Sequence, residues 1–361
     1  MARKKRNNVA AVEDDFYGKV VREHSSDLTE LDGKDTGIPD GENDSLIAVS
    51  PENLPVNVTL PCTIYMKSFG KIFVFRRQGE KINYKVALEM SKKGGTFLFV
   101  HKAFWDMFMQ SLEALGESND NSEAKTQHMR RLLLAYGMEL EKKLKEPKKP
   151  MFEKLERLAN SISDSIQRDP KTAATLLKPP SDPQFYFTNH SINSAVYATL
   201  IGIKQNYDAS DIKKLTYATL VHDVGNLFLP KRILFKRSAL SPDDRELMKT
   251  HPRKGAELLQ SLKSPPEVVR SVLQHHERID GAGYPEGLTG IEIHPFAKII
   301  AIADAYDALT SNRPHCQAVT PKEALQKMLE AKGHYDQELL KVVDESAEKA
   351  KKSDPEKKDA A

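Results

Sequence analysis

A helical apolar period, broken at intervals by proline, runs through almost the whole second half of this 361-residue chain. Leu155, Leu158, Ile162 and Ile166 show it clearly, because spacings of three and four residues place side chains on one face of a helix. Further helices are predicted at 192–200, 215–222, 242–262, 265–276, 295–310 and 321–331. Several begin with proline, which is favoured in the first turn of a helix. No segment here alternates as a strand does, so this half is predicted to be an all-α bundle.

The first half has a different pattern, with short runs rich in β-branched and aromatic residues. Two such runs, 63–66 and 71–75, are separated by Ser68-Phe69-Gly70, which predicts a β-hairpin. A third run at 96–100 is predicted to be a buried strand.

Two helices are expected beside these strands, a short one over 84–93 and a longer one over 101–115. The apolar face of the longer helix is expected to carry Phe104, Met107, Phe108 and Leu112. These elements predict a small α+β domain.

Shifts in composition set the expected domain limits. The stretch from His24 to Pro51 is rich in Ser, Asp, Gly, Glu and Pro, and a segment with so few apolar residues cannot offset its ordering entropy by burial. A lysine- and proline-containing connection is expected over 141–151. The predicted organisation is a flexible segment at 1–52, the α+β domain at 53–145, the helical domain at 151–345 and a flexible tail at 346–361.

Charge and cysteine content exclude several classes of protein. The chain has 54 Lys and Arg against 51 Asp and Glu, and a net charge of +3 provides no field for sequence-specific nucleic-acid binding. No stretch approaches the ~20 apolar residues that a membrane-spanning helix needs, and no secretion signal is recognisable. The two cysteines, Cys62 and Cys316, form no metal-binding pair and predict no disulfide framework. A cytoplasmic protein without a membrane span is expected.

Histidine and aspartate residues recur at helical positions of the second half. They are His190, the adjacent pair His222 and Asp223, His251, the adjacent pair His275 and His276, and Asp304. A single histidine on an apolar helix is more often a hydrogen-bonded core residue than a ligand. Five imidazoles and two carboxylates in one bundle, however, could not all be buried cheaply without cations. Mixed imidazole and carboxylate ligation suits iron, manganese or zinc, and an aspartate can bridge two ions.

The motifs around these residues resemble those of the HD-GYP family, in the HD phosphohydrolase superfamily. The matching stretches are His-Asp-Val-Gly at 222–225, Met-Lys-Thr-His-Pro at 248–252, the run from His275 to Pro285, and the run from Ala303 to Pro314. The resemblance spans roughly residues 181–340 and implies a helical bundle of the HD type. Known members of this family hydrolyse the bacterial second messenger cyclic di-GMP.

The resemblance also implies a ligand set. One ion would be held by His190, His222, Asp223 and Asp304, and a second by Asp223 with His251, His275 and His276. Two divalent ions are expected, iron being favoured over manganese. A metal-bridging hydroxide would open cyclic di-GMP to the linear dinucleotide pGpG, with GMP as a further product.

Other residues are assigned by the same resemblance. Asp223 and Asp280 are the predicted catalytic residues, and Asn226, Tyr284 and Arg313 are the predicted substrate contacts. The glycines and proline of 281–285 could equally form a tight turn that only supports the histidine pair. Arg313 could bind a phosphate or a guanine edge, or could cap the preceding helix.

Three positions depart from the family pattern. Asn226 stands where active members carry lysine, Cys316 stands at a basic position, and Tyr186 replaces a glutamate that holds a third ion in some members. Each lost charge-assisted contact is worth roughly 1.5 to 3 kcal/mol. The alternative hypothesis is therefore a weakly active or inactive module. Such a module would bind a cyclic dinucleotide, or it would bind a signalling protein through its Gly-Tyr-Pro loop. The enzyme remains the first hypothesis, because the predicted ligand set is complete.

Overall fold

The computed structural model describes residues 45–49, 54, 59–68, 71–82, 98–117, 122–142, 149–177, 186–234, 236, 239–312 and 317–341. The chain divides between Ser118 and Asn119 into two compact units, one built around a sheet and one helical. The predicted helix at 84–93 and tail at 346–361 lie outside the described residues.

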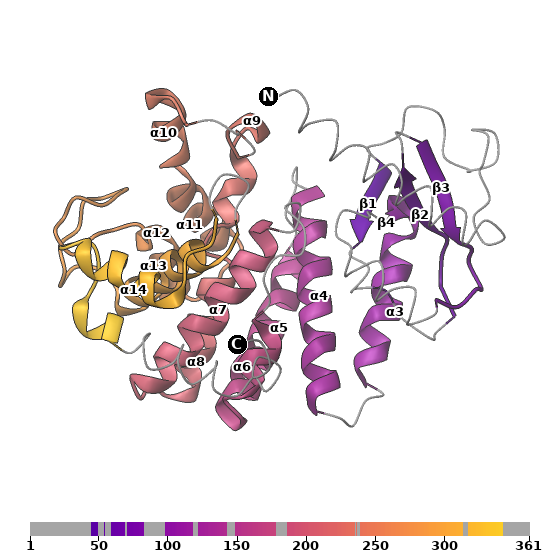
Figure 1. The fold of residues 1–361 in the computed structure, drawn as a ribbon, viewed down its shortest axis with the longest axis horizontal. Helices are drawn as coiled ribbons and strands as arrows, with labels where there is room; N and C mark the ends of the chain where they lie inside the picture. Colours follow the sequence, from indigo (N-terminus) through magenta and orange to yellow (C-terminus); the bar gives the residue numbers. More distant parts are fainter. Residues whose placement is uncertain are drawn as a thin grey trace, which may run out of the picture. The chain divides into compact units, whose positions relative to one another are not determined.

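The first unit contains a four-stranded antiparallel sheet with the order β1-β4-β2-β3. Its strands are β1 (Leu46–Val49), β2 (Ile64–Ser68), β3 (Lys71–Arg76) and β4 (Leu98–His101). The predicted hairpin is confirmed, since Ser68 pairs with Lys71 across the turn between β2 and β3. The third predicted strand is β4, which lies between β1 and β2 (Figure 1).

Strand β1 corrects the prediction of a flexible segment over residues 1–52. Leu46, Ile47, Ala48 and Val49 are each 2–3% exposed, and they pair with β4 from Leu46 opposite His101 to Val49 opposite Leu98. Four consecutive apolar residues can cover one edge of a sheet even when the average composition around them is polar. The rest of the predicted segment, 1–44 and 50–52, lies outside the described residues.

The helix after β4 buries only part of the face that was predicted. It begins as a 3₁₀ turn, η3 (Lys102–Phe104), and continues as α3 (Trp105–Glu117). Trp105, Phe108 and Leu112 are at most 1% exposed, whereas Phe104 is 42% and Met107 45% exposed. Phe108 and Leu112 are therefore confirmed on the buried face, whereas the prediction was wrong for Phe104 and Met107, because Trp105 takes the buried position three residues before Phe108.

The second unit consists of helices. Their bounds are α4 (Ser122–Lys142), α5 (Lys149–Arg168), α6 (Thr172–Leu176), α7 (Tyr186–Lys204), α8 (Ala209–Leu220), η5 (Val224–Phe228), α9 (Lys231–Leu234), α10 (Pro242–Met248), α11 (His251–Ser261), α12 (Pro266–Gln274), α13 (Pro295–Thr310) and α14 (Pro321–Glu330). Helix α7 packs against α8, α13, α5 and α4, and α11 packs against α12 and η5 (Figure 1). The predicted helical architecture of this half is confirmed.

Helix α4 belongs to the second unit, although its residues lie within the predicted first domain at 53–145. It packs against α5, α6 and α7, and it carries buried residues such as Leu133 and Tyr136. Helix α5 begins at Lys149 within the predicted connection, with Pro150 as its second residue. Polar residues such as Lys and Glu are frequent in both helices, which made this stretch look like a solvated connection.

The predicted helix at 242–262 is two helices, α10 and α11. Pro252 lies in the first turn of α11, where its missing N–H costs nothing. In an uninterrupted helix the N–H of residue 252 would donate to the carbonyl of Met248, and the proline ring would clash with that carbonyl. The break therefore leaves the Met248 carbonyl free for another donor.

Candidate metal centre

Three of the predicted ligands lie at helix ends, where carbonyls have no partner within the helix. His222 Nδ1 lies 2.6 Å from the Thr219 carbonyl after α8, and His275 Nδ1 lies 2.7 Å from the Val272 carbonyl after α12. His251 Nδ1 lies 2.8 Å from the Met248 carbonyl, which the proline break leaves free.

A carbonyl accepts hydrogen bonds and never donates them, so each of these three rings carries its proton on Nδ1. The neutral ring then presents the lone pair of Nε2. All three Nε2 atoms are therefore set up as acceptors or metal ligands by the helix ends.

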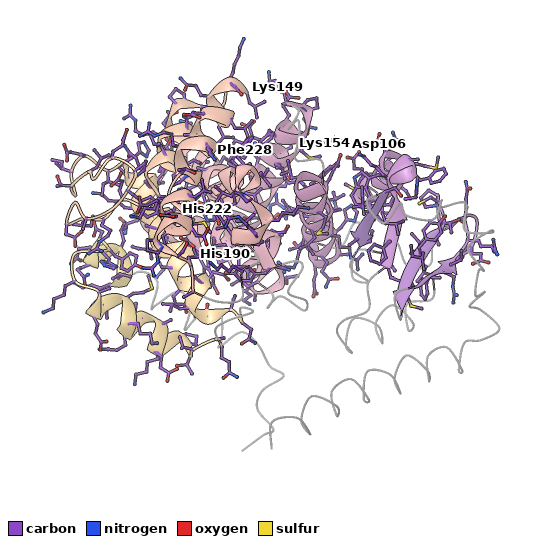
Figure 2. All side chains as sticks on the ribbon, turned by 90° about the horizontal axis from the view of Figure 1, so that it is seen from above. Asp106, Lys149, Lys154, His190, His222 and Phe228 are labelled. Atoms are coloured by element: carbon purple, nitrogen blue, oxygen red, sulfur yellow. The ribbon has the colours of Figure 1, made fainter. Side chains whose placement is uncertain are left out.

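His190 differs because it lies inside helix α7. Its Nδ1 lies 2.7 Å from Asp307 Oδ2, and its Nε2 lies 3.0 Å from Asp304 Oδ1. Both carboxylates come from α13, which packs against α7. His190 and His222 are neighbours, with ring centroids 5.5 Å apart (Figure 2).

The nitrogen and oxygen donors form two groups that share Asp223. Within each group the donor atoms lie within 4.8 Å of one another. One group contains Asp223, His251, His275 and His276. The other group contains His190, His222 and Asp223. Asp304 joins the second group through its contact with His190, so the structure brings all seven predicted ligands together.

Gly225 fixes the distance between Asp223 and His251. A Cβ atom at Gly225 would lie 1.9 Å from the His251 carbonyl oxygen and 2.8 Å from the Gly255 nitrogen. Because glycine permits this close approach of η5 to α11, Asp223 Oδ1 comes within 3.2 Å of His251 Nε2.

The residues fit divalent cations on two observations. His222 Nε2 is buried and has no hydrogen-bond partner among the described residues. In addition, His251 Nε2 lies 3.3 Å from His275 Nε2 and 3.2 Å from Asp223 Oδ1, and three such acceptors need a proton or a cation between them. Buried acceptors that face one another or no donor are costly, and cations would satisfy them.

The charges in the cluster also suit cations. Burial opposes ionisation of Asp223, but His222 and His251 hold its pKa well below the usual range. The pKa of Asp304 is likewise held low by His190, against the effect of burial. Both carboxylates are therefore ionised at neutral pH, and their side chains are 22% and 18% exposed, so they are reachable from solvent.

Two of the predicted histidine ligands, His275 and His276, are neutral at neutral pH. Burial lowers the pKa of His276 to about 4 and the pKa of His275 well below its usual value. The pKa of His190 rises to about 10, because its hydrogen bonds with Asp304 and Asp307 outweigh burial. In the absence of an ion, a proton therefore occupies the Nε2 position of His190 that faces Asp304.

Tyr284 faces this cluster. Its ring centroid lies 4.8 Å from that of His276, and its N–H donates to the His276 carbonyl at 3.2 Å. Burial raises the pKa of Tyr284, and Asp223 and Asp304 add to this effect. The peptide bond between Tyr284 and Pro285 is cis.

Asp280 lies in a different setting. Its carboxylate accepts from Arg278 at 2.5 and 3.0 Å and from the Ala282 N–H at 3.0 Å, and it belongs to neither donor group. Its N–H donates to the Gly333 carbonyl. These contacts brace the loop, and the catalytic role of Asp280 stays a prediction.

Of the remaining predicted residues, Asn226 lies in η5, and its Oδ1 is buried without a partner among the described residues. Arg313 and Cys316 lie outside the described residues. The Tyr186 ring stacks on the predicted ligand His190, with ring centroids 5.7 Å apart.

Two buried carboxylates escaped the sequence prediction. Asp307 is 1% exposed and contacts His190, and Glu277 is 4% exposed and accepts from the Glu286 and Leu288 N–H groups at 2.7 and 3.0 Å. The position of Asp307, three residues after Asp304 on one helix face, was the available signal. Glu277 directly follows the histidine pair, but its role depends on loop geometry that spacing does not reveal.

The fold and the site together define a helical domain built around a histidine–aspartate cluster that could hold metal ions. A family model described as an HD domain matches residues 158–339. The chain belongs to the HD domain family, and the predicted resemblance to its HD-GYP members is confirmed by the relatives below.

The chain is 34% identical over 188 residues to the cyclic di-GMP phosphodiesterase PA4108 of Pseudomonas aeruginosa, covering 51% of this chain and 45% of that protein. It is 37% identical over 138 residues to the cyclic di-GMP phosphodiesterase response regulator RpfG of Xanthomonas campestris, covering 38% and 36%. It is also 34% identical over 145 residues to the 3'3'-cGAMP-specific phosphodiesterase 3 of Vibrio cholerae, covering 40% and 32%. The chain thus spans less than half the length of each of these relatives.

Among solved structures, Bd1817 of Bdellovibrio bacteriovorus, titled an HDG"Y"P protein, has a TM-score of 0.66. The match covers 84% of this chain and 99% of that one at 18% sequence identity, and it shows a shared fold. In the part of the chain that the structure describes, every helix is too short or too polar to cross a lipid bilayer.

Proposed function

We propose that this chain is a metal-dependent phosphodiesterase that hydrolyses cyclic di-GMP to pGpG, with GMP as a further product. The observation that carries the proposal is the pair of donor groups that share Asp223. Relatives of the helical domain named as cyclic di-GMP and cGAMP phosphodiesterases support this class of substrate.

When bound, two divalent ions would lower the pKa of a water molecule and neutralise charge on the phosphodiester. Asp223 would contribute a carboxylate to both ion positions, because it faces His222 in one donor group and His251 in the other. The helix-end carbonyls hold the ring protons of His222, His251 and His275 on Nδ1, away from the cluster. We propose iron for both positions, with manganese as the alternative, since both accept mixed imidazole and carboxylate ligation.

Around the ions, Tyr284 offers a hydroxyl and an aromatic ring beside His276, which fits contact with a substrate phosphate or base. We further propose that Asn226 and Arg313 contact the substrate and that the reaction takes place in the cytoplasm.

One observation favours a second candidate, a weakly active or inactive module that binds a cyclic dinucleotide or a signalling partner. Asn226 provides no positive charge next to the cluster, and its Oδ1 has no donor among the described residues. A missing cation at a phosphate weakens transition-state binding more than it weakens metal binding.

The test is to purify the protein anaerobically with iron, count metals per chain, and follow cyclic di-GMP by chromatography beside Asp223→Ala. We expect about two ions per chain, formation of pGpG, and loss of both in the variant. Asp211→Ala, which removes a carboxylate paired with Lys214 on the surface of α8, is the matched control and should keep both. If two ions bind and the dinucleotide stays intact, the second candidate is the better description.

A further inference from the structure

His190 is the one imidazole of the four described above whose Nδ1 is held by a carboxylate instead of a backbone carbonyl. It lies at the fifth residue of α7, where the carbonyls of the preceding turn are engaged in the helix itself. Since no helix end is available there, another group must fix the ring.

Asp307 fills this role from α13. Its Oδ2 lies 2.7 Å from His190 Nδ1, while its Oδ1 accepts from Asn193 Nδ2 at 2.9 Å and from Ser311 Oγ at 3.0 Å. The residue is 1% exposed, and each carboxylate oxygen thus has a donor. Asn193 lies one turn after His190 on α7, so the network ties the two helices together at the ligand.

The geometry points to Asp307 as a positioning residue that keeps the proton of His190 on Nδ1 and thereby directs Nε2 to the metal position shared with His222 and Asp223. This inference rests on the proposed metal centre. Buried carboxylates behind metal-bound histidines raise ligand basicity and fix the tautomer, and their loss typically weakens metal binding 10- to 100-fold.

The network explains why an amide cannot replace this carboxylate. Asparagine at 307 has one acceptor and one NH₂ group, whereas the site contains donors on both sides. If the acceptor serves Asn193 and Ser311, the NH₂ group faces His190 Nδ1, which must then accept and move its proton to Nε2. That tautomer has no lone pair for an ion, as in a catalytic triad whose aspartate is replaced by asparagine.

The inference predicts a selective loss. The donor group of Asp223, His251, His275 and His276 is held independently by helix ends and stays intact. Asp307→Asn should therefore reduce the metal content from about two ions per chain to about one, with the affinity for the lost ion at least tenfold weaker. A general defect in folding would lower both positions together.

The experiment compares the full chain, Asp307→Asn and the control Asp244→Asn, which removes a similarly buried carboxylate paired with Arg232 and Lys236. Zinc, a diamagnetic probe for mixed imidazole and carboxylate sites, is titrated against a competing chelator, and the protonated nitrogen of each ¹⁵N-labelled histidine is identified by NMR. We expect two zinc ions and Nδ1-protonated His190 in the parent and control, and one ion with Nε2-protonated His190 in Asp307→Asn.

Two ions of parental affinity in Asp307→Asn, or an unchanged His190 tautomer, would overturn the positioning role and leave the metal centre standing. Failure of the parent chain to bind zinc, iron or manganese would overturn both. Loss of both ions in Asp307→Asn would show a structural role and would also overturn the inference.

Discussion

The two donor groups that share Asp223 form a cluster, and the loop from Glu277 to Gly290 directly follows its last histidine, His276, in sequence. Over the described parts of the chain, polar groups lack hydrogen-bond partners in the cluster, whereas they are hydrogen-bonded in the loop. In the cluster, His222 Nε2 has no partner among the described residues and two Nε2 acceptors face each other. In the loop, Glu277 accepts two backbone N–H groups and Asp280 is bound by Arg278 and the Ala282 N–H. Buried polar groups without hydrogen-bond partners indicate a binding site, whereas groups whose hydrogen bonds are complete indicate a structural role.

Metal removal should show this contrast most strongly. A chelator is expected to abolish hydrolysis and, for ions present at about a thousand times their Kd, to cost about 4 kcal/mol of stability for each ion removed. Thermal unfolding and hydrogen exchange measure both regions at once, and the N–H groups of Glu286 and Leu288 should stay protected because Glu277 holds them. Loss of their protection together with the ions would contradict the separation of cluster and loop.

A substitution in the loop should have the converse effect. In Glu277→Gln, one of the two N–H groups faces an NH₂ group, so we expect a loss of about 1–3 kcal/mol in urea unfolding while two ions remain bound. Glu292→Gln is the matched control, because Glu292 accepts from the Thr289 N–H and hydroxyl but is exposed. A fall in metal content in Glu277→Gln would show that the loop contributes directly to ligation.

The smallest effect is expected at Asp244, a carboxylate satisfied outside both regions. Hydrogen bonds from Lys236 and Arg232 hold its pKa below the usual value of 3.8. A lowered folded-state pKa stabilises the protein above the usual pKa, and this contribution declines as the pH falls below it. Asp244→Asn should therefore flatten the pH dependence of Tm below about pH 4, without changing metal content. An unchanged profile would show that these ion pairs are screened by solvent.

The residues of the two donor groups could be named from the sequence because the motifs around them resemble those of the HD-GYP family, and their role as metal ligands stays a prediction. His222 and Asp223 are adjacent, as are His275 and His276, and the helices that carry them have clear apolar periods. A short apolar run, in contrast, gives weak information about phase and partners. Phe104 and Met107 fit a helical face with Phe108 and Leu112 as well as Trp105 does, and Leu46–Val49 could not be paired with β4 before the sheet was known.

Asp307 and Glu277 show a second limit. Their contacts depend on which donors converge on them from other elements, Asn193 from α7 and the N–H groups of Glu286 and Leu288 from a loop. Such convergence is a property of packing: the spacing of Asp307 from Asp304 indicates a shared helix face, but it does not identify these donors. The same limit applies to Asp280, whose motif position indicated chemistry and whose contacts are those of a brace.

Pro252 has a consequence beyond ending a helix. A residue with an N–H at this position would compete with the His251 ring for one acceptor, the Met248 carbonyl. Without this hydrogen bond the His251 ring would be free to rotate and to exchange its proton between its two nitrogens. Proline removes the competitor covalently. The Met248 carbonyl thus stays available to orient the His251 imidazole, and no further side chain is needed for this purpose.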